Sequence, residues 1–135
     1  FPHRWIYEMI EAWYSNGILG FGSDSEDARG INHSPAIAGA YFAAKLGVVE
    51  YLSEKKIQAG VVILREIRPE YAIPVGVWQV REGIREAMKQ KPAISDTFDQ
   101  ALILASNKMS ISKTEWLSHG KISQIIRQKT LSDFF

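Results

Sequence analysis

The sequence predicts a helix-rich domain of the α/β or α+β class, with about five helices, at least one buried strand and a flexible C-terminal tail. Apolar residues recur at helical spacing in several separate segments, and one short run is continuously apolar, as in a buried strand. Of the 135 residues, 46% are hydrophobic. A fraction this high lets a single domain bury a core and argues against a disordered chain.

The first predicted element is a helix over residues 3–15. Five apolar residues fall on one face of such a helix: Trp5, Ile6, Met9, Ile10 and Trp13. The Ser15-Asn16-Gly17 sequence is expected to end it. Residues 16–34 are rich in glycine and show little periodicity, so we expect a long loop there, of the kind that is often functional.

A second helix is expected to begin at Ser34-Pro35 and to run to about Lys55. Serine is a favoured N-cap residue, and proline is favoured at the first helical position. Within this helix a small residue recurs at every fourth position, at Gly39, Ala43 and Gly47. A stripe of small residues lets another backbone approach closely, so we expect this helix to pack tightly in the core.

Residues 59–67 are apolar until they become charged at Arg65 and Glu66, which predicts a buried strand. A helix follows from Val77 to about Gln90, and a further one begins after a cap at Ser95 or Asp96. A short helix is expected over residues 118–127. We therefore predict a domain over residues 1–117, a connecting helix over 118–127 and a tail over 128–135, with a sheet completed by residues outside this chain.

Several chemistries are excluded by composition and spacing. A chain without cysteine has no disulfides, no thiolate zinc site and no cysteine nucleophile, and it fits a reducing interior. The three histidines lack metal-ligand spacing, and neither a phosphate-binding loop nor a dinucleotide fingerprint occurs. The longest nearly unbroken apolar stretch, residues 36–44, is too short to cross a bilayer. We expect no membrane contact and no cofactor in this chain.

One segment concentrates acidic residues beside an arginine: Asp24, Glu26, Asp27 and Arg29. Clustered carboxylates suit a hard cation such as magnesium or general acid–base chemistry. The spacing is not that of an EF-hand loop. An exposed acidic loop, or an acidic cap on a helix start, would give the same pattern. These four residues are therefore candidate catalytic residues, and the alternative stays open.

Arg65 and Arg81 complete the candidate set. Arg65 lies at the carboxyl end of the predicted strand, where ligands bind in open α/β sheets, and alternation sends the Arg65 and Glu66 side chains to opposite faces. Arg81 shares a helical face with Trp78 and Arg85 and could hold a phosphate. The alternative is structural pairing of Arg81 or Arg85 with Glu82 or Glu86. We expect Arg81 and the acidic segment to share a cleft.

The C-terminal tail carries the most specific pattern. Gln128, Leu131, Phe134 and Phe135 resemble the PIP box, the peptide by which replication and repair proteins dock on the sliding clamp PCNA. Average composition would produce this pattern about once in 10⁴ positions. The last 28 residues also carry five basic and two acidic side chains, which is compatible with work near DNA. The alternative is that the three apolar side chains pack back onto the domain.

Four further stretches, Trp5-Ile6-Tyr7-Glu8, residues 25–30, residues 40–45 and residues 65–71, together with residues 74–82, look like the C-terminal region of the archaeal Nre DNA repair proteins. The resemblance implies a cytoplasmic role in DNA repair at the clamp. It also implies an additional N-terminal half with a cysteine-rich zinc-binding segment. This chain begins with Phe and has no such segment, so we expect a C-terminal piece.

Three functions follow as hypotheses. The first is a DNA repair factor that the PIP box recruits to PCNA, with DNA as a second partner. The second is an enzyme acting on nucleic acid or a nucleotide, a hydrolase or transferase, with the acidic segment and arginines as its site. The third is a structural scaffold whose ligand is the clamp alone. Convergence of the acids and arginines on one cavity would favour the enzyme.

Overall fold

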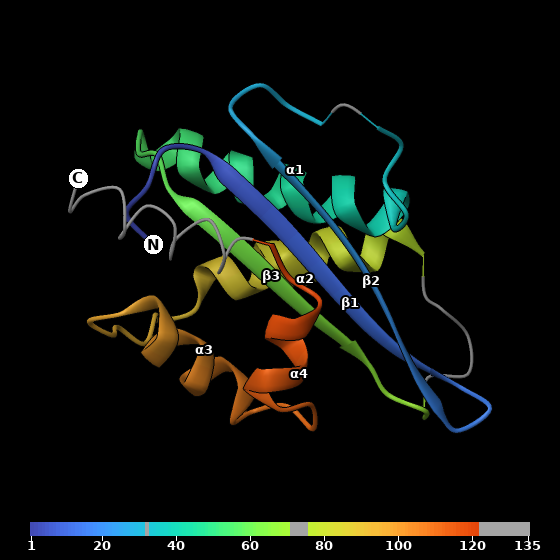
Figure 1. The fold of residues 1–135 in the computed structure, drawn as a ribbon. Coiled ribbons are helices and arrows are strands. Elements are labelled where there is room, and N and C mark those ends of the chain that lie inside the picture. Colours follow the sequence, from blue (N-terminus) through green and yellow to red (C-terminus); the bar gives the residue numbers. More distant parts are fainter. Residues whose placement is uncertain (32, 71–75, 122–135) are drawn as a thin grey trace, which may run out of the picture.

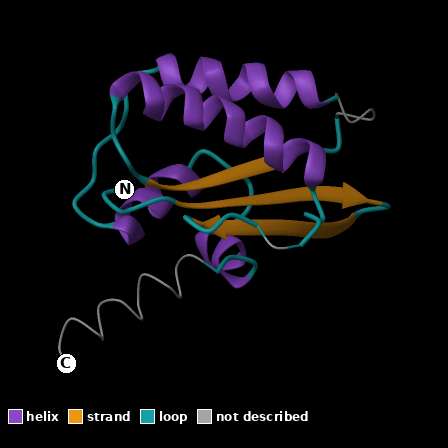
Figure 2. Ribbon diagram, turned by 90° about the horizontal axis from the view of Figure 1, so that it is seen from above, coloured by secondary structure: helices purple, strands orange, loops and turns teal. Residues whose placement is uncertain are grey.

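A three-stranded sheet forms the centre of the fold, with helices on both faces (Figures 1 and 2). The computed structural model describes residues 1–31, 33–70 and 76–121. The elements in these ranges are β1 (Ile6–Ser15), β2 (Ile18–Asp27), α1 (Ala38–Lys55), β3 (Gly60–Ile67), α2 (Val77–Lys89), α3 (Phe98–Ser106) and α4 (Lys113–Ser118). The strand order is β2-β1-β3, with β1 antiparallel to β2 and parallel to β3. Helices α1 and α2 cover one face and α3 and α4 the other, so the domain is of the α+β class.

The prediction of a helix over residues 3–15 is wrong, and the loop predicted over 16–34 is wrong for residues 18–27, because residues 6–27 form the hairpin of β1 and β2. Asn16 and Gly17 make the two-residue turn, both with positive φ, which is the geometry that an Asn-Gly pair favours. As the middle strand, β1 is buried from both faces. Its apolar residues therefore do not alternate, and such a run has no clear strand period.

The glycines that made β2 resemble a loop have a packing role. The Trp13 indole of β1 lies over them, and a Cβ at Gly20 would stand 2.9 Å from Trp13 Nε1. A Cβ at Gly22 would stand 2.8 Å from a methyl group of Ile37, at the start of α1. Because β2 must pass beneath a large ring, glycine replaces the apolar residues that would have marked it as a strand.

Helix α1 confirms the predicted helix but starts later. Its N-cap is Ile37, with no side-chain cap, and it ends before Lys56, whose backbone is left-handed. The small residues face α2, as predicted. A Cβ at Gly39 would stand 3.0 Å from Val77, and one at Gly47 would stand 2.8 Å from Ile84. These residues therefore set the spacing between the two helices.

The later elements are confirmed in part. Strand β3 and helices α2 and α3 lie where the sequence predicts them, with Thr97 rather than Ser95 or Asp96 as the α3 N-cap. Helix α4, capped by Ser112, was not predicted. The described ranges hold four helices rather than five, and none is long and apolar enough to cross a membrane. Most of the predicted helix over residues 118–127, and all of the tail over 128–135, lie outside the described residues.

Two clusters of buried residues flank the sheet. On one face, β1 packs against the two long helices through Tyr7, Met9, Ile37, Tyr41, Ala43, Ala44 and Val80, which we name the α1-side core. On the other, it packs against α4 and the segment just before it through Ile10, Ala12, Ile111 and Trp116, which we name the α4-side core. Because β1 contributes to both, it links the two layers of helices.

The glycines at positions 47 and 83 provide a test of the α1–α2 contact. Gly47→Ala should lower the free energy of unfolding by about 1–3 kcal/mol, since the new methyl group meets the branched part of Ile84 and forces the helices apart. Gly83→Ala, in the interior of α2 with open space around its Cβ position, should raise it by about 0.5–1 kcal/mol. Urea unfolding of both variants measures this, and stabilisation by both would contradict the close packing.

Candidate functional site

Two of the predicted site residues, Asp24 and Glu26, lie on β2 rather than in a loop. They stand opposite Met9 and Tyr7 of β1 in the antiparallel register. Residues two apart on a strand share a face, so both carboxylates point toward α1 with the α1-side core. Both residues are buried, with exposed fractions of 7% and 8%. Buried carboxylates need partners, and α1 supplies most of them.

Glu26 is the centre of this network. Its carboxylate accepts hydrogen bonds from Trp5 Nε1 at 2.9 Å and from the Tyr41 hydroxyl at 2.9 Å. Lys45 Nζ lies 2.7 Å from Glu26 Oε1. Burial by itself would raise the pKa of Glu26, but the hydrogen bonds from Lys45, Trp5 and Tyr41 outweigh it, so this pKa lies below its ordinary value. Glu26 is therefore ionised at neutral pH.

Asp24 holds the start of α1 in place. Its Oδ2 accepts a hydrogen bond from the backbone N–H of Ile37, the α1 N-cap residue, at 3.0 Å. Its Oδ1 lies 3.4 Å from Nε2 of His33, whose side chain is about half exposed. A carboxylate beside the first turn of a helix satisfies an otherwise unpaired N–H and interacts favourably with the helix dipole.

The two tyrosines of the network keep their protons. Tyr7 donates a hydrogen bond from its hydroxyl to the backbone carbonyl of Tyr41 at 2.9 Å. Burial, together with the nearby Glu26 carboxylate, raises the pKa of Tyr7 well above its ordinary value. Burial and the hydrogen bond to Glu26 do the same to the pKa of Tyr41. Tyr41 and Lys45 lie one turn apart on α1. Because its pKa is raised, Tyr41 stays protonated at neutral pH and cannot act as a base.

The remaining acid and two of the arginines form separate pairs. Asp27 pairs with Arg29 at 2.7 Å, and the Arg29 side chain is 90% exposed. Hydrogen bonds from Arg29 hold the pKa of Asp27 below its ordinary value. Arg65 pairs with Glu11 of β1 at 2.6 Å. Glu66 points to the opposite face, where the Ser110 hydroxyl donates to it, so the predicted divergence of Arg65 and Glu66 is confirmed.

Arg81 joins none of these pairs. Its Nε is buried and has no hydrogen-bond partner. Arg85, one turn further along α2, makes the predicted arginine–glutamate pairing, with Glu82 at 2.8 Å and Glu50 of α1 at 2.7 Å. In the described ranges, no hydrogen bond or ion pair joins Arg65 or Arg81 to the acids of β2. The expectation that Arg81 and the acidic segment share a cleft gains no support from these contacts.

The acids of this segment take part in contacts within the domain. The acids at positions 24, 26 and 27 are each occupied by donors of the same domain. Across residues 1–31, 33–70 and 76–121, no group of three or more histidine, aspartate or glutamate residues is placed to hold a metal ion. The geometry makes the buried carboxylates structural.

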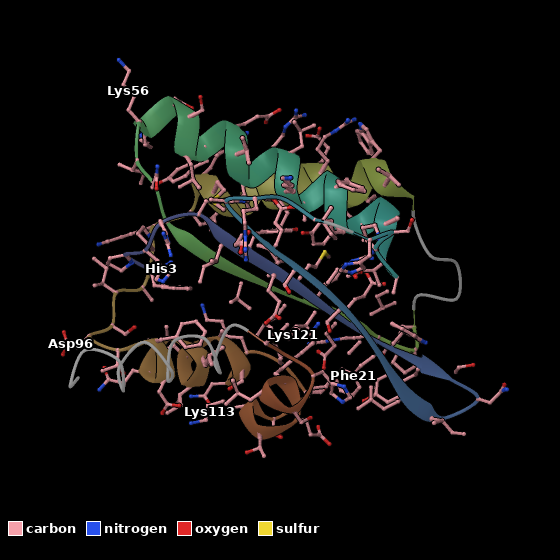
Figure 3. All side chains as sticks on the ribbon, turned by 45° about the horizontal axis from the view of Figure 1, so that its top comes forward. His3, Phe21, Lys56, Asp96, Lys113 and Lys121 are labelled. Atoms are coloured by element: carbon pink, nitrogen blue, oxygen red, sulfur yellow. The ribbon has the colours of Figure 1, made fainter. Side chains whose placement is uncertain are left out.

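A third buried carboxylate, Glu8, was missed by the sequence analysis. It is 2% exposed and lies on the α4 side of β1, where its Oε2 accepts a hydrogen bond from the backbone N–H of Lys121 at 2.7 Å. Nearby, the His119 ring stacks on Phe21 at 3.8 Å, and Ser23 donates to the His119 carbonyl at 2.8 Å. Figure 3 shows Phe21 and Lys121 close to α4. We name these contacts the tail anchor, because the C-terminal tail follows them.

Glu26→Gln should destabilise the domain by about 1–3 kcal/mol at pH 7, because it leaves the Lys45 ammonium without its counter-charge in a largely buried site. The folded-state pKa is lowered, so the stability from the ionised carboxylate is present above the unfolded value near 4.5 and is lost as the pH falls through the folded value. The gap between the wild type and the variant should therefore shrink below about pH 4.5. Urea unfolding at pH 7 and at acidic pH measures it.

Asp27→Asn is the matched control, since Asp27 pairs with a solvent-exposed arginine. Exposed ion pairs contribute little, so this variant should unfold close to the wild-type midpoint at both pH values. If Glu26→Gln and Asp27→Asn shifted the unfolding midpoint equally, the Glu26 network would not be a specific source of stability.

Comparison with known proteins gives consistent matches. Residues 26–134 match the family model described as archaeal Nre, C-terminal. The chain is 38% identical over 139 aligned positions to the DNA repair protein NreA of Archaeoglobus fulgidus, covering 99% of this chain and 34% of that protein. It is 32% identical to the DNA repair protein NreB of the same organism, covering 98% of this chain and 36% of that protein. No solved structure matches.

A further relative is the DNA repair protein NreA of Haloferax volcanii, 37% identical over 110 positions that cover 75% of this chain and 26% of that protein. The chain spans about a third of the length of the two Archaeoglobus relatives. The resemblance to the C-terminal region of the archaeal Nre proteins is thereby confirmed. This chain belongs to the archaeal Nre family and matches its C-terminal region.

Proposed function

We propose that this chain is part of a DNA repair factor that docks on the sliding clamp PCNA through Gln128, Leu131, Phe134 and Phe135. The first support is the family, whose relatives are named as DNA repair proteins. The second is the motif itself, which fills all four defining positions of a PIP box. The matched family segment runs to residue 134, so it includes the motif up to its first phenylalanine.

The chemistry of the motif fits a small docking contact. In a 3₁₀ turn, residues three apart eclipse, so Leu131 and Phe134 would project together beside Phe135 as an apolar plug. The Gln128 amide can both donate and accept hydrogen bonds. Burial of the three apolar side chains contributes about 1.5–3 kcal/mol each, less the cost of ordering the tail, and we expect a net of about −7 to −8 kcal/mol for the whole contact. This is a low-micromolar contact, suited to recruitment.

The tail anchor gives this motif a fixed base. Lys121 is held to Glu8 of the central strand, and six residues separate it from Gln128. Extended chain spans about 3.5 Å per residue, so Gln128 can lie up to about 25 Å from the anchor. A docked tail would thus keep the folded domain close to the clamp and to the DNA passing through it.

DNA is the second proposed partner. Three basic residues flank or lie within the connecting segment and the motif: Lys121, Arg127 and Lys129. Cations in this position would contact phosphates of DNA threaded through a ring, and such contacts weaken with salt. Several equivalent sites on one clamp would raise the effective affinity further.

Two further expectations from the resemblance belong to the longer protein. A zinc site would lie in the part of the relatives that has no counterpart in this chain, and the location would be cytoplasmic. The enzyme alternative needs Asp24, Glu26, Asp27, Arg29, Arg65 and Arg81 to act together. Since the acids are occupied by separate structural partners, no observation favours this alternative over the docking function.

The double substitution Phe134→Ala, Phe135→Ala should weaken clamp binding at least about a hundredfold, because each buried aromatic contributes about 1.5–3 kcal/mol. Isothermal titration of purified archaeal PCNA with the whole chain measures the change. Unfolding midpoints should stay unchanged, which would separate loss of docking from loss of folding.

Ile18→Ala, Ile94→Ala is the matched control, since it removes two apolar side chains that are 72% and 89% exposed in the folded domain. It should bind the clamp like the wild type. Equal binding by the wild type and the double phenylalanine variant would show that the tail is not the docking element.

A further inference from the structure

The outer edge of β3 borders an apolar cavity. In the order β2-β1-β3, β3 has a neighbouring strand on one side only. A cavity of about 790 Å³ lies along it, between the long helices and α3. Its apolar lining includes Val48, Leu52, Val62, Leu64, Met88 and Leu102. An open strand edge beside apolar side chains is a surface for an additional strand.

The first residue of the chain already occupies one end of this edge. The Phe1 amino group donates to the Gly60 carbonyl at 2.9 Å, and the Gly60 N–H donates to the Phe1 carbonyl at 2.9 Å. Two residues that exchange both hydrogen bonds form an antiparallel pair. The Phe1 ring packs on Gly60, where a Cβ would overlap it, and meets the edge of Phe98 at 5.0 Å between ring centroids.

This pairing fixes a direction. In an antiparallel pair, the chain that comes before Phe1 must run toward Val62 and Leu64, along the outer edge of β3 and into the cavity. Backbone groups alternate along a strand, so the N–H and C=O groups of Val62 and Leu64 point outward, as those of Gly60 do. They would pair with the second and fourth residues before Phe1.

We propose that the segment immediately preceding position 1 in a full-length polypeptide binds this edge as a fourth strand, antiparallel to β3. The Archaeoglobus relative NreA supports a longer polypeptide, since 99% of this chain covers only 34% of it. Both faces of the added strand would meet apolar groups, Val48 and Met88 on one side and Leu102 on the other. The segment should therefore be predominantly apolar, without proline at its second or fourth position before Phe1.

Hydrogen exchange measured by NMR tests the added strand. The 135-residue chain is compared with a polypeptide extended by its natural upstream residues. The amides of Val62 and Leu64 should exchange at least about tenfold more slowly in the extended polypeptide. The amides of Val61 and Ile63, which face β1, should change little. Unchanged exchange at Val62 and Leu64 would overturn the proposal.

Proline substitution provides a second measurement. Val62→Pro removes an outward N–H, which an open edge tolerates and a paired edge does not. It should lower the unfolding temperature further in the extended polypeptide than in the 135-residue chain, whereas Val62→Thr, which keeps the N–H, should affect both alike. Equal loss from Val62→Pro in both would overturn the proposal. Slow amide exchange at Val62 and Leu64 in the 135-residue chain that depends on protein concentration would also overturn it, because this would assign the edge to a second copy of the chain.

Discussion

Burial of β1 on both faces is the constraint on which the rest of the fold depends. Tyr7 and Met9 belong to the α1-side core, and Ile10 and Ala12 belong to the α4-side core. One strand thus packs against helices on both faces of the sheet. A change that tilts β1 therefore alters both layers of helices. Every buried polar group on β1 also needs a hydrogen-bond partner within the protein.

The buried carboxylates meet this requirement through donors from other parts of the domain. Asp24 and Glu26 tie α1 to the sheet on one face, and Glu8 ties the end of the described chain to it on the other. In each case the partner comes from a distant part of the sequence. A carboxylate buried for such contacts gives the same sequence pattern as a catalytic one, which is why an acidic cluster in a sequence is weak support for catalysis.

The sequence predicts well the elements that bury a single face against one neighbouring element. Helix α2 has a clear apolar face, and Gly39 and Gly47 indicate a close helix contact that the structure confirms. Prediction from sequence fails in β1, where burial on both faces removes the alternation of apolar and polar residues typical of a strand. It also fails in β2, where glycines lie beneath the Trp13 ring. The Asn16-Gly17 pair was the local signal for the hairpin. The partners of Glu26 could not be predicted, because they come from two segments outside β2: Trp5 before β1, and Tyr41 and Lys45 on α1.

The tail anchor and the proposed docking tail require opposite properties of neighbouring residues. A docking peptide must change conformation on its partner, so its ordering cost has to be small and local. A fixed base restricts the volume that the tail explores. The effective concentration of the tail near a clamp ring that lies close to the domain is then higher. In the proposed function Glu8 would supply this fixed base, because its hydrogen bond to the Lys121 backbone does not depend on the side chain at position 121. The Lys121 side chain takes no part in this hydrogen bond, and in the proposed function it would be available to contact a phosphate of DNA.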